Sequence, residues 1–195
     1  MNGFLLQRLG QIMEPEPGNP QEAEGVLNPA VVRGPDGQLY LFPRLVARGN
    51  YSRIGIARVR FDEAGDPAGV ERLGIALEPE ADYERRSDGS GGCEDPRITF
   101  VERFQRYVMT YTAFSPIGPR IALAVSEDLL HWERLGLATF EPYHGIDFDL
   151  GTPDRIDVYY GMADKRIGVA RLDVPEHLPP GAPADGEGPR TRGQA

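Results

Sequence analysis

The sequence predicts an all-β chain. Its apolar runs are only five to eight residues long and rich in Ile, Val, Tyr and Phe, which favours strands over helices. The 24 glycines and 18 prolines stand between these runs as turn signals. No stretch indicates a helix longer than about two turns. Strands are expected near residues 29–33, 38–43, 53–60, 70–77, 97–101, 106–113, 120–126, 132–137, 155–160 and 166–172.

An internal repeat indicates how these strands are organised. The landmark pairs, each 67 positions apart, are Pro29 and Pro96, Tyr40 and Tyr107, and Arg53 and Arg120. A third copy of the Arg-Ile strand, 166–170, begins only 46 residues after Arg120. Four-stranded sheets repeated at a fixed period are typical of a β-propeller. A β-sandwich with coincidental similarity between its halves is the alternative.

The composition changes after Asp173, so two regions are expected. Residues 1–173 form the folded domain, and residues 174–195 are rich in proline and glycine with almost no large apolar side chains. Such a segment buries too little surface to offset the entropy of ordering it, which predicts a disordered tail.

Charge and cysteine usage exclude several classes of protein. Lys and Arg number 21 against 30 Asp and Glu, a net charge of −9, which argues against a nucleic-acid binder. No apolar run approaches the ~20 residues of a membrane helix, and the first residues do not resemble a signal peptide, so a cytoplasmic protein is expected. The single cysteine, Cys93, excludes an internal disulfide. The three histidines lack metal-ligand spacing, so no metal site and no cofactor are expected.

The densest polar cluster is residues 91–97, which contains Glu94, Asp95 and Arg97 around a proline. At the entrance of a propeller strand, Asp95 would point toward the central axis, and partial burial there would suit a general acid. The alternative is structural: Asp95 caps a turn, while Glu94 and Arg97 form a surface ion pair.

The repeat adds three candidates for a binding site. Asn28 stands before Pro29 as Asp95 stands before Pro96, and Arg44 and Tyr111 are related by the same offset of 67. A ring of Asn28, Arg44, Asp95 and Tyr111 would offer a polyhydroxylated ligand fixed donors, acceptors and an aromatic face. Each also has a structural reading: a turn residue for Asn28, a rim charge for Arg44 and a core side chain for Tyr111.

Taken together, these segments resemble glycoside hydrolase family 130, the β-mannoside phosphorylases and related mannosidases. The matching stretches, which span most of residues 4–173, are 25–30, 40–44, 52–57, 93–99, 107–115, 126–132 and 157–170. The Glu-Asp-Pro-Arg segment followed by Met109-Thr110-Tyr111-Thr112-Ala113 is the most specific of them.

The resemblance implies a five-bladed propeller that binds a β-mannoside in its axial funnel. It implies that Asp95 is the general acid, protonating the leaving oxygen through a mannose hydroxyl, while phosphate attacks the anomeric carbon from the opposite face. The product is mannose 1-phosphate with inverted configuration, and phosphate is a co-substrate. The implied substrate-binding residues are Asn28, Arg44, Glu94, Tyr111 and Asp164, and the candidate phosphate ligands are Arg53, Arg97 and Arg120.

The chain departs from the family pattern in one respect. The middle of the family's domain is missing, with a junction near residues 150–153, which accounts for the shortened repeat spacing. We therefore expect an incomplete propeller of two four-stranded blades, about 27–77 and 95–137, and a partial blade. Two alternatives to an active enzyme follow: a non-catalytic sugar-binding fragment, or an assembly domain that forms a homo-oligomer by pairing exposed blade faces.

Overall fold

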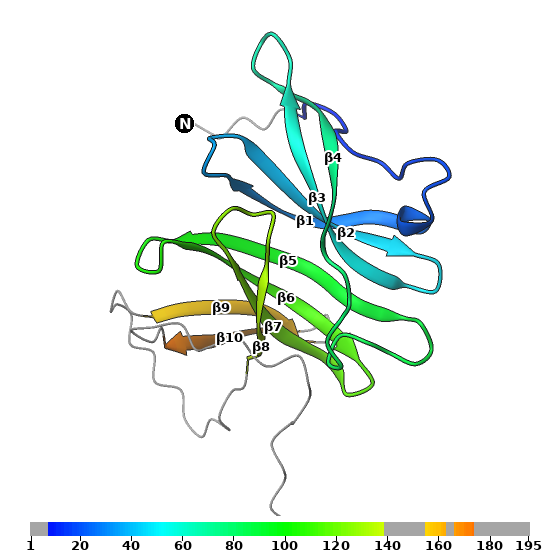
Figure 1. Ribbon diagram of the computed structural model, residues 1–195, viewed down its shortest axis with the longest axis vertical. Helices are drawn as coiled ribbons and strands as arrows, with labels where there is room; N and C mark the ends of the chain where they lie inside the picture. Colours follow the sequence, from blue (N-terminus) through cyan, green and yellow to red (C-terminus); the bar gives the residue numbers. More distant parts are fainter. Residues whose placement is uncertain (1–7, 139–154, 163–165, 174–195) are drawn as a thin grey trace, which may run out of the picture. The chain divides into compact units, whose positions relative to one another are not determined.

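The computed structural model describes residues 8–138, 155–162 and 166–173, which fall into two compact units divided near residue 138. The prediction of an all-β protein is confirmed over these residues, which form ten strands and one short 3-10 turn, η1 (Pro20–Glu22) (Figure 1). In the described segments, no helix has the length and apolar character needed to cross a membrane.

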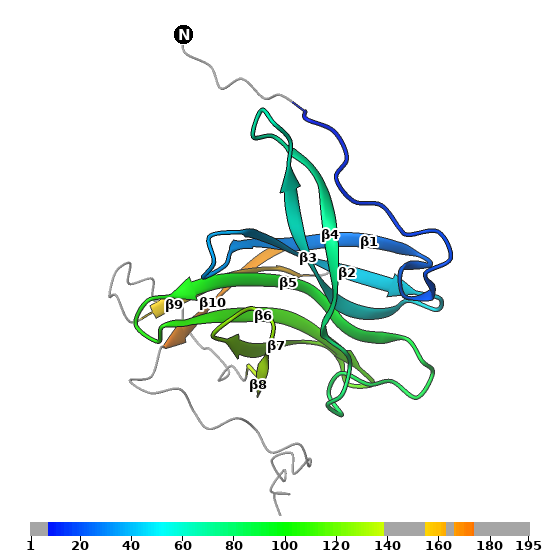
Figure 2. The ribbon, with the colours of Figure 1, turned by 45° about the horizontal axis from the view of Figure 1, so that its top comes forward.

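The larger unit contains one four-stranded antiparallel meander for each sequence repeat. The first repeat sheet consists of β1 (Gly25–Arg33), β2 (Leu39–Ala47), β3 (Tyr51–Phe61) and β4 (Pro67–Leu77). The second repeat sheet consists of β5 (Gly91–Val101), β6 (Arg106–Ser115), β7 (Gly118–Ser126) and β8 (Glu133–Leu137). β3 and β4 form a long twisted hairpin whose tip extends beyond the neighbouring strands (Figure 2).

A short parallel contact joins the two repeat sheets. Tyr51 and Ser52 of β3 pair with Gly91 and Gly92 of β5, so the strand order runs β1-β2-β3-β5-β6-β7-β8 with β4 on β3. β1 and β5, the first or inner strands of the two repeat sheets, also lie close together. This arrangement brings equivalent positions of the two repeats next to each other.

The strands begin earlier than the sequence predicts at the two repeat prolines. Pro29 and Pro96 lie inside β1 and β5, at register shifts between Leu27 and Ala30 and between Glu94 and Arg97. A proline has no N–H to donate to a ladder, and a bulge is where a strand tolerates it. Asp95 therefore lies within a strand rather than at its entrance.

The main core lies between the two repeat sheets. Tyr40, Phe42 and Ile54 of the first sheet pack in one cluster with Met109 and Ala122 of the second. The Phe42 ring meets Trp132 edge to face, with centroids 5.8 Å apart. Large and small residues alternate along β7, and its alanines, Ala122 and Ala124, face the first sheet. Because these side chains are small, the two sheets can pack closely there.

The strand register corrects the expected equivalence of Arg44 and Tyr111. Arg44 pairs with Ile54, and the residue 67 positions after Ile54, Ile121, pairs with Thr112. Thr112 is therefore the structural counterpart of Arg44. The second strand of the second repeat, β6, is shifted by one residue relative to β2, in addition to the offset of 67 that relates the first and third strands. A shift of one residue turns a side chain to the opposite face of a sheet, so Tyr111 and Arg44 do not occupy equivalent positions.

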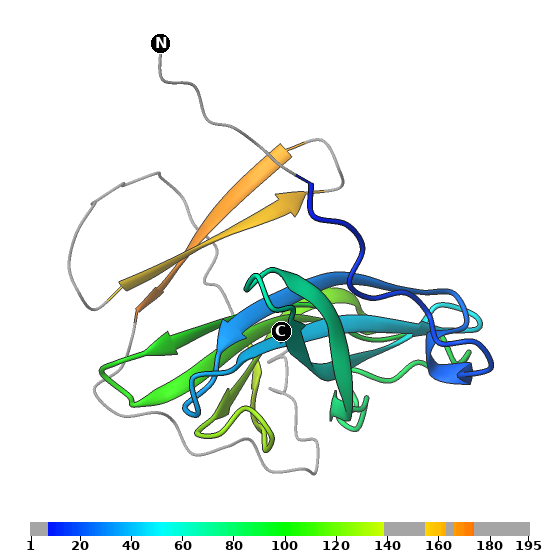
Figure 3. The same ribbon diagram turned by 90° about the horizontal axis from the view of Figure 1, so that it is seen from above.

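The smaller unit contains the antiparallel hairpin of β9 (Arg155–Met162) and β10 (Arg166–Asp173) (Figure 3). The predicted strands 155–160 and 166–172 are confirmed in this hairpin. Asp164, the junction at 150–153 and the expected disordered tail lie outside the described residues.

Candidate active site

Asn28 and Asp95, equivalent residues of the two repeats, meet in the structure. Asn28 Nδ2 donates to Asp95 Oδ1 at 2.9 Å. Both residues have left-handed backbone conformations, with φ of 42° and 49°, which are uncommon outside glycine and best tolerated by Asn and Asp. The two bulges thus turn a carboxamide and a carboxylate toward each other from neighbouring inner strands.

Arg44 completes this cluster from β2. Its Nη1 lies 3.4 Å from Asp95 Oδ1, and its Nη2 lies 2.9 Å from Glu94 Oε1. The side chain of Arg44 is only 11% exposed, whereas that of Asp95 is 34% exposed. The most accessible charged group of the cluster is therefore the carboxylate expected to be the general acid.

Glu94 is a buried member of the same cluster. The residue is 8% exposed, and burial raises the pKa of its carboxyl group, as does the neighbouring Asp95, while Arg44 lowers it. The structural alternative of a surface pair between Glu94 and Arg97 is wrong. Glu94 binds Arg44 instead, and Arg97 Nη1 donates to the carbonyl oxygen of Pro96.

Two further residues orient Arg44, and sequence reasoning did not select either as a site residue. Arg44 Nε donates to Ser52 Oγ at 2.9 Å, and Arg44 Nη2 donates to Asn50 Oδ1 at 2.9 Å. Ser52 belongs to a stretch that matches the family, which was the available signal. Asn50 is a turn residue with φ of 59°, and it looks like any other turn asparagine in the sequence.

Tyr111 lies in a different network. It is 2% exposed, and its hydroxyl donates to Glu84 Oε1 at 2.5 Å. Burial and the carboxylate of Glu84 raise the pKa of Tyr111 far above that of a free tyrosine. Arg134 Nε binds both oxygens of Glu84, at 3.0 and 3.2 Å. Tyr111 thus helps to fix the connection between the two repeat sheets and is not brought to the Asp95 cluster.

The three arginines expected to bind phosphate have separate partners. Arg53 Nε lies 2.8 and 2.6 Å from the two carboxylate oxygens of Glu78. Arg97 and Arg120 each donate to the carbonyl oxygen of the preceding proline. These contacts share no common partner, and the assignment of the three arginines to phosphate stays a prediction.

Within the described segments, no group of three His, Cys, Asp or Glu side chains could hold a metal ion. Cys93 is 0% exposed, and burial raises the pKa of its thiol well above the usual value. A neutral buried thiol is a poor nucleophile, which fits a packing role.

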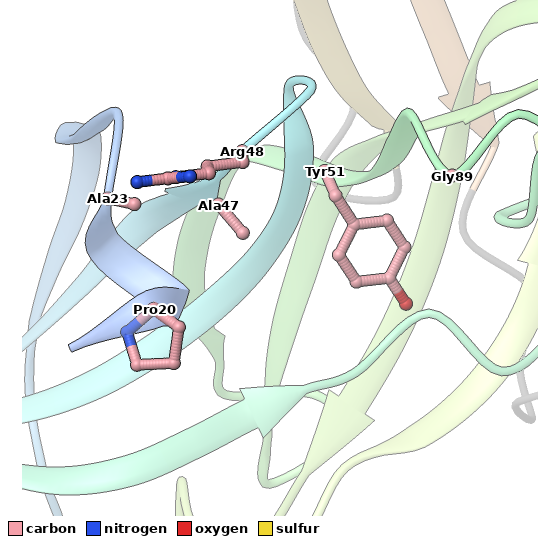
Figure 4. A pocket seen from close by; sticks show the side chains of 6 residues that line it. All are labelled: Pro20, Ala23, Ala47, Arg48, Tyr51 and Gly89. Carbon is pink, nitrogen blue, oxygen red and sulfur yellow. The ribbon is translucent and has the colours of Figure 1, made fainter.

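A separate open cavity of about 450 Å³ lies beside the β2–β3 turn. Figure 4 shows its lining, which consists of Pro20, Ala23, Ala47, Arg48, Tyr51 and Gly89. None of these residues belongs to the Asp95 cluster, so the cavity is not part of the candidate site.

Comparison with known proteins identifies the family. The model of the family of β-1,4-mannooligosaccharide phosphorylases matches residues 5–152. The chain belongs to glycoside hydrolase family 130. Its Asn28–Asp95 cluster falls within the matched part.

Individual relatives agree with this assignment. A 1,2-β-oligomannan phosphorylase of Thermoanaerobacter sp. (strain X514) is 30% identical over 169 residues, which cover 83% of this chain and 53% of the relative. A candidate glycoside hydrolase of Parabacteroides distasonis ATCC 8503 superimposes with a TM-score of 0.53 and 28% identity, over 82% of this chain and 48% of that one. A second one, from Bacteroides ovatus ATCC 8483, gives a TM-score of 0.54 and 29% identity, over 71% and 42%. The chain thus spans about half the length of these relatives.

Proposed function

We propose that the Asp95 cluster is the mannoside-binding and proton-donating part of a β-mannoside phosphorylase-like site. The observation that carries this proposal is the meeting of Asn28, Arg44 and Asp95 from three strands, in which the carboxylate of Asp95 is more exposed than the guanidinium of Arg44. Fixed donors around a partly exposed carboxyl group suit a sugar, because sugar hydroxyls need partners of fixed direction.

In this reaction, Asp95 in its protonated form gives its proton to the leaving oxygen, through a hydroxyl of the bound mannose. The bond between the anomeric carbon and that oxygen breaks, and a phosphate oxygen forms a new bond to the carbon from the opposite face. The products are the shortened sugar and mannose 1-phosphate of inverted configuration.

Arg53, Arg97 and Arg120 remain our candidates for phosphate, and Asp164 for the mannose hydroxyls. The fold that we propose around this site is part of a five-bladed propeller.

The test is phosphate-dependent release of mannose 1-phosphate from β-1,2- and β-1,4-linked mannobiose and from β-1,4-mannosyl-glucose. We expect turnover that needs phosphate and falls by at least ~100-fold in Asp95→Asn, since general acids contribute roughly 10²–10⁴-fold. Asp88→Asn is the matched control, because Asp88 pairs with Arg86 in the 78–90 connection and touches none of the cluster. Full activity in Asp95→Asn would reject the assignment.

A second candidate function is sugar binding without turnover. The chain spans only about half the length of its relatives, and each of the expected phosphate ligands binds a separate partner within the protein. This function predicts that mannobiose binds the wild-type protein while no mannose 1-phosphate forms at any phosphate concentration.

A further inference from the structure

The carboxylate of Glu94 has no sugar-facing position in the cluster, because it is 8% exposed and bound to Arg44. The first repeat shows that the bulge itself does not require an acid here. The equivalent residue, at the same register shift in β1, is Leu27, which is 41% exposed. The backbone thus forms the same bulge with an exposed leucine in one repeat and a buried glutamate in the other.

Arg44 lies between two carboxylates, and Glu94 holds it at the shorter distance. Its Nη2 is 2.9 Å from Glu94, whereas its Nη1 is 3.4 Å from Asp95. Ser52 and Asn50 take two further N–H groups of Arg44. Both contacts to Asp95, from Asn28 and from Arg44, end on Oδ1.

If Arg44 were released from Glu94, its guanidinium could bind Asp95 with two hydrogen bonds instead. Its planar fork matches a carboxylate with two parallel hydrogen bonds, and a buried cation without a counter-charge is costly. Asp95 is the other carboxylate within reach. The charged groups that meet here are Arg44, Glu94 and Asp95, while Asn28, Asn50 and Ser52 are neutral.

We propose that Glu94 is a positioning residue: it binds Nη2 of Arg44 so that Arg44 reaches Asp95 at one oxygen only, which leaves Oδ2 for the sugar. This inference rests on the proposed function of Asp95. It assigns Glu94 a different role from the substrate contact that the family resemblance implies.

The first measurement needs no turnover. In 15N spectra of arginine side chains, a guanidinium held on both sides gives separate signals for Nη1 and Nη2, and Arg44→Lys identifies those of Arg44. We expect separate signals in the wild-type protein and altered positions for both of them in Glu94→Gln. Glu22→Gln is the control, because Glu22 is 1% exposed and binds Arg72 away from this cluster. Unchanged Arg44 signals in Glu94→Gln would overturn the proposal.

The second measurement is kinetic and applies when the wild-type protein is active. We expect Glu94→Gln to lower kcat by at least ~10-fold with KM within about twofold, since a misplaced catalytic group costs more in the reaction than in binding. Glu94→Asp, which keeps the charge, should recover part of the loss. A rise in KM with kcat unchanged would instead make Glu94 a substrate contact and contradict the proposal. Wild-type protein without activity would reject the proposed function alone, because the 15N measurement tests the positioning separately.

Discussion

At the scale of single residues, the site depends on side chains that share one cation. Asp95 and Glu94 are consecutive in the chain, yet their environments differ: the side chain of Asp95 is 34% exposed and that of Glu94 10%. A regular strand would turn two consecutive side chains to opposite faces, whereas both acids contact Arg44 here, at the point where the bulge breaks the alternation of β5. The sequence shows the two acids side by side but does not show which of them is buried.

Glu84 is the residue that sequence reasoning missed most completely. It lies in the polar segment between β4 and β5, where a glutamate is normally solvated, yet it is 0% exposed. Its carboxylate accepts hydrogen bonds from Tyr111, Arg134 and the N–H groups of Glu80 and Ala81. The two side-chain partners, Tyr111 and Arg134, are 27 and 50 positions away, so no local pattern could have revealed them.

We predict that Glu84→Gln lowers the free energy of unfolding by about 3 kcal/mol, because it leaves Arg134 beside a neutral group in a buried network. Glu80→Gln is the matched control: Glu80 also binds Arg134, but its side chain is 65% exposed, and its loss should cost less than about 1 kcal/mol. Urea unfolding at neutral pH measures both variants. Equal costs would show that burial of the pair does not matter.

The deficit of Glu84→Gln should also depend on pH. Burial alone would raise the pKa of Glu84, but the hydrogen bonds from Arg134, Tyr111 and the two backbone N–H groups outweigh it and lower the pKa. The stability that Glu84 contributes is therefore present above the ordinary pKa of glutamate and lost as the pH falls through the lowered value. The variant and the wild-type protein should converge in stability toward acidic pH.

At the scale of elements, the period-2 and turn signals predicted ten strands, and all ten are present in the described residues. The repeat of 67 positions correctly related the inner strands, because the bulges at Asn28 and Asp95 coincide under it. It failed for the second strands, where one extra residue shifts the register. Such a shift arises in a turn and leaves no trace in the alternation of side chains.

The parallel contact between β3 and β5 requires a glycine at position 92. Gly92 has φ of 116°, and a Cβ on it would overlap the carbonyl oxygen of Ser52. Because backbone lies at that point, no side-chain rotation can relieve the overlap. The parallel contact between β3 and β5 therefore needs a glycine at position 92.

We predict that Gly92→Ala separates the two repeat sheets and lowers the free energy of unfolding by at least ~3 kcal/mol, through strain added to a backbone clash. Gly89→Ala is the control, since Gly89 has φ of 72° but open space where the alanine Cβ would lie. That variant should cost only the ~1–2 kcal/mol of a left-handed alanine. Thermal unfolding compares the two variants. Similar melting temperatures would contradict the claim that the contact between β3 and β5 requires a glycine at position 92.

At the scale of the whole molecule, both repeat sheets lie within the part of the chain that matches the family model. The chain, however, spans only about half the length of its relatives. The part that matches the family model includes both inner-strand bulges and Arg44. Family resemblance indicated Asn28, Arg44 and Asp95, and the structure brings these three together. It also indicated Tyr111, whose hydroxyl instead binds Glu84, a partner 27 positions away in the sequence.

The central claim is that Asn28, Arg44 and Asp95 form a binding site for a β-mannoside. Titration of 15N-labelled protein with β-1,2-mannobiose tests it most directly. The account predicts that the side-chain amide of Asn28, Nε of Arg44 and the backbone N–H of Asp95 shift together and saturate at one mannobiose per chain. Shifts confined to other residues, such as those around Tyr51, or none at these three positions at saturating sugar, would contradict it.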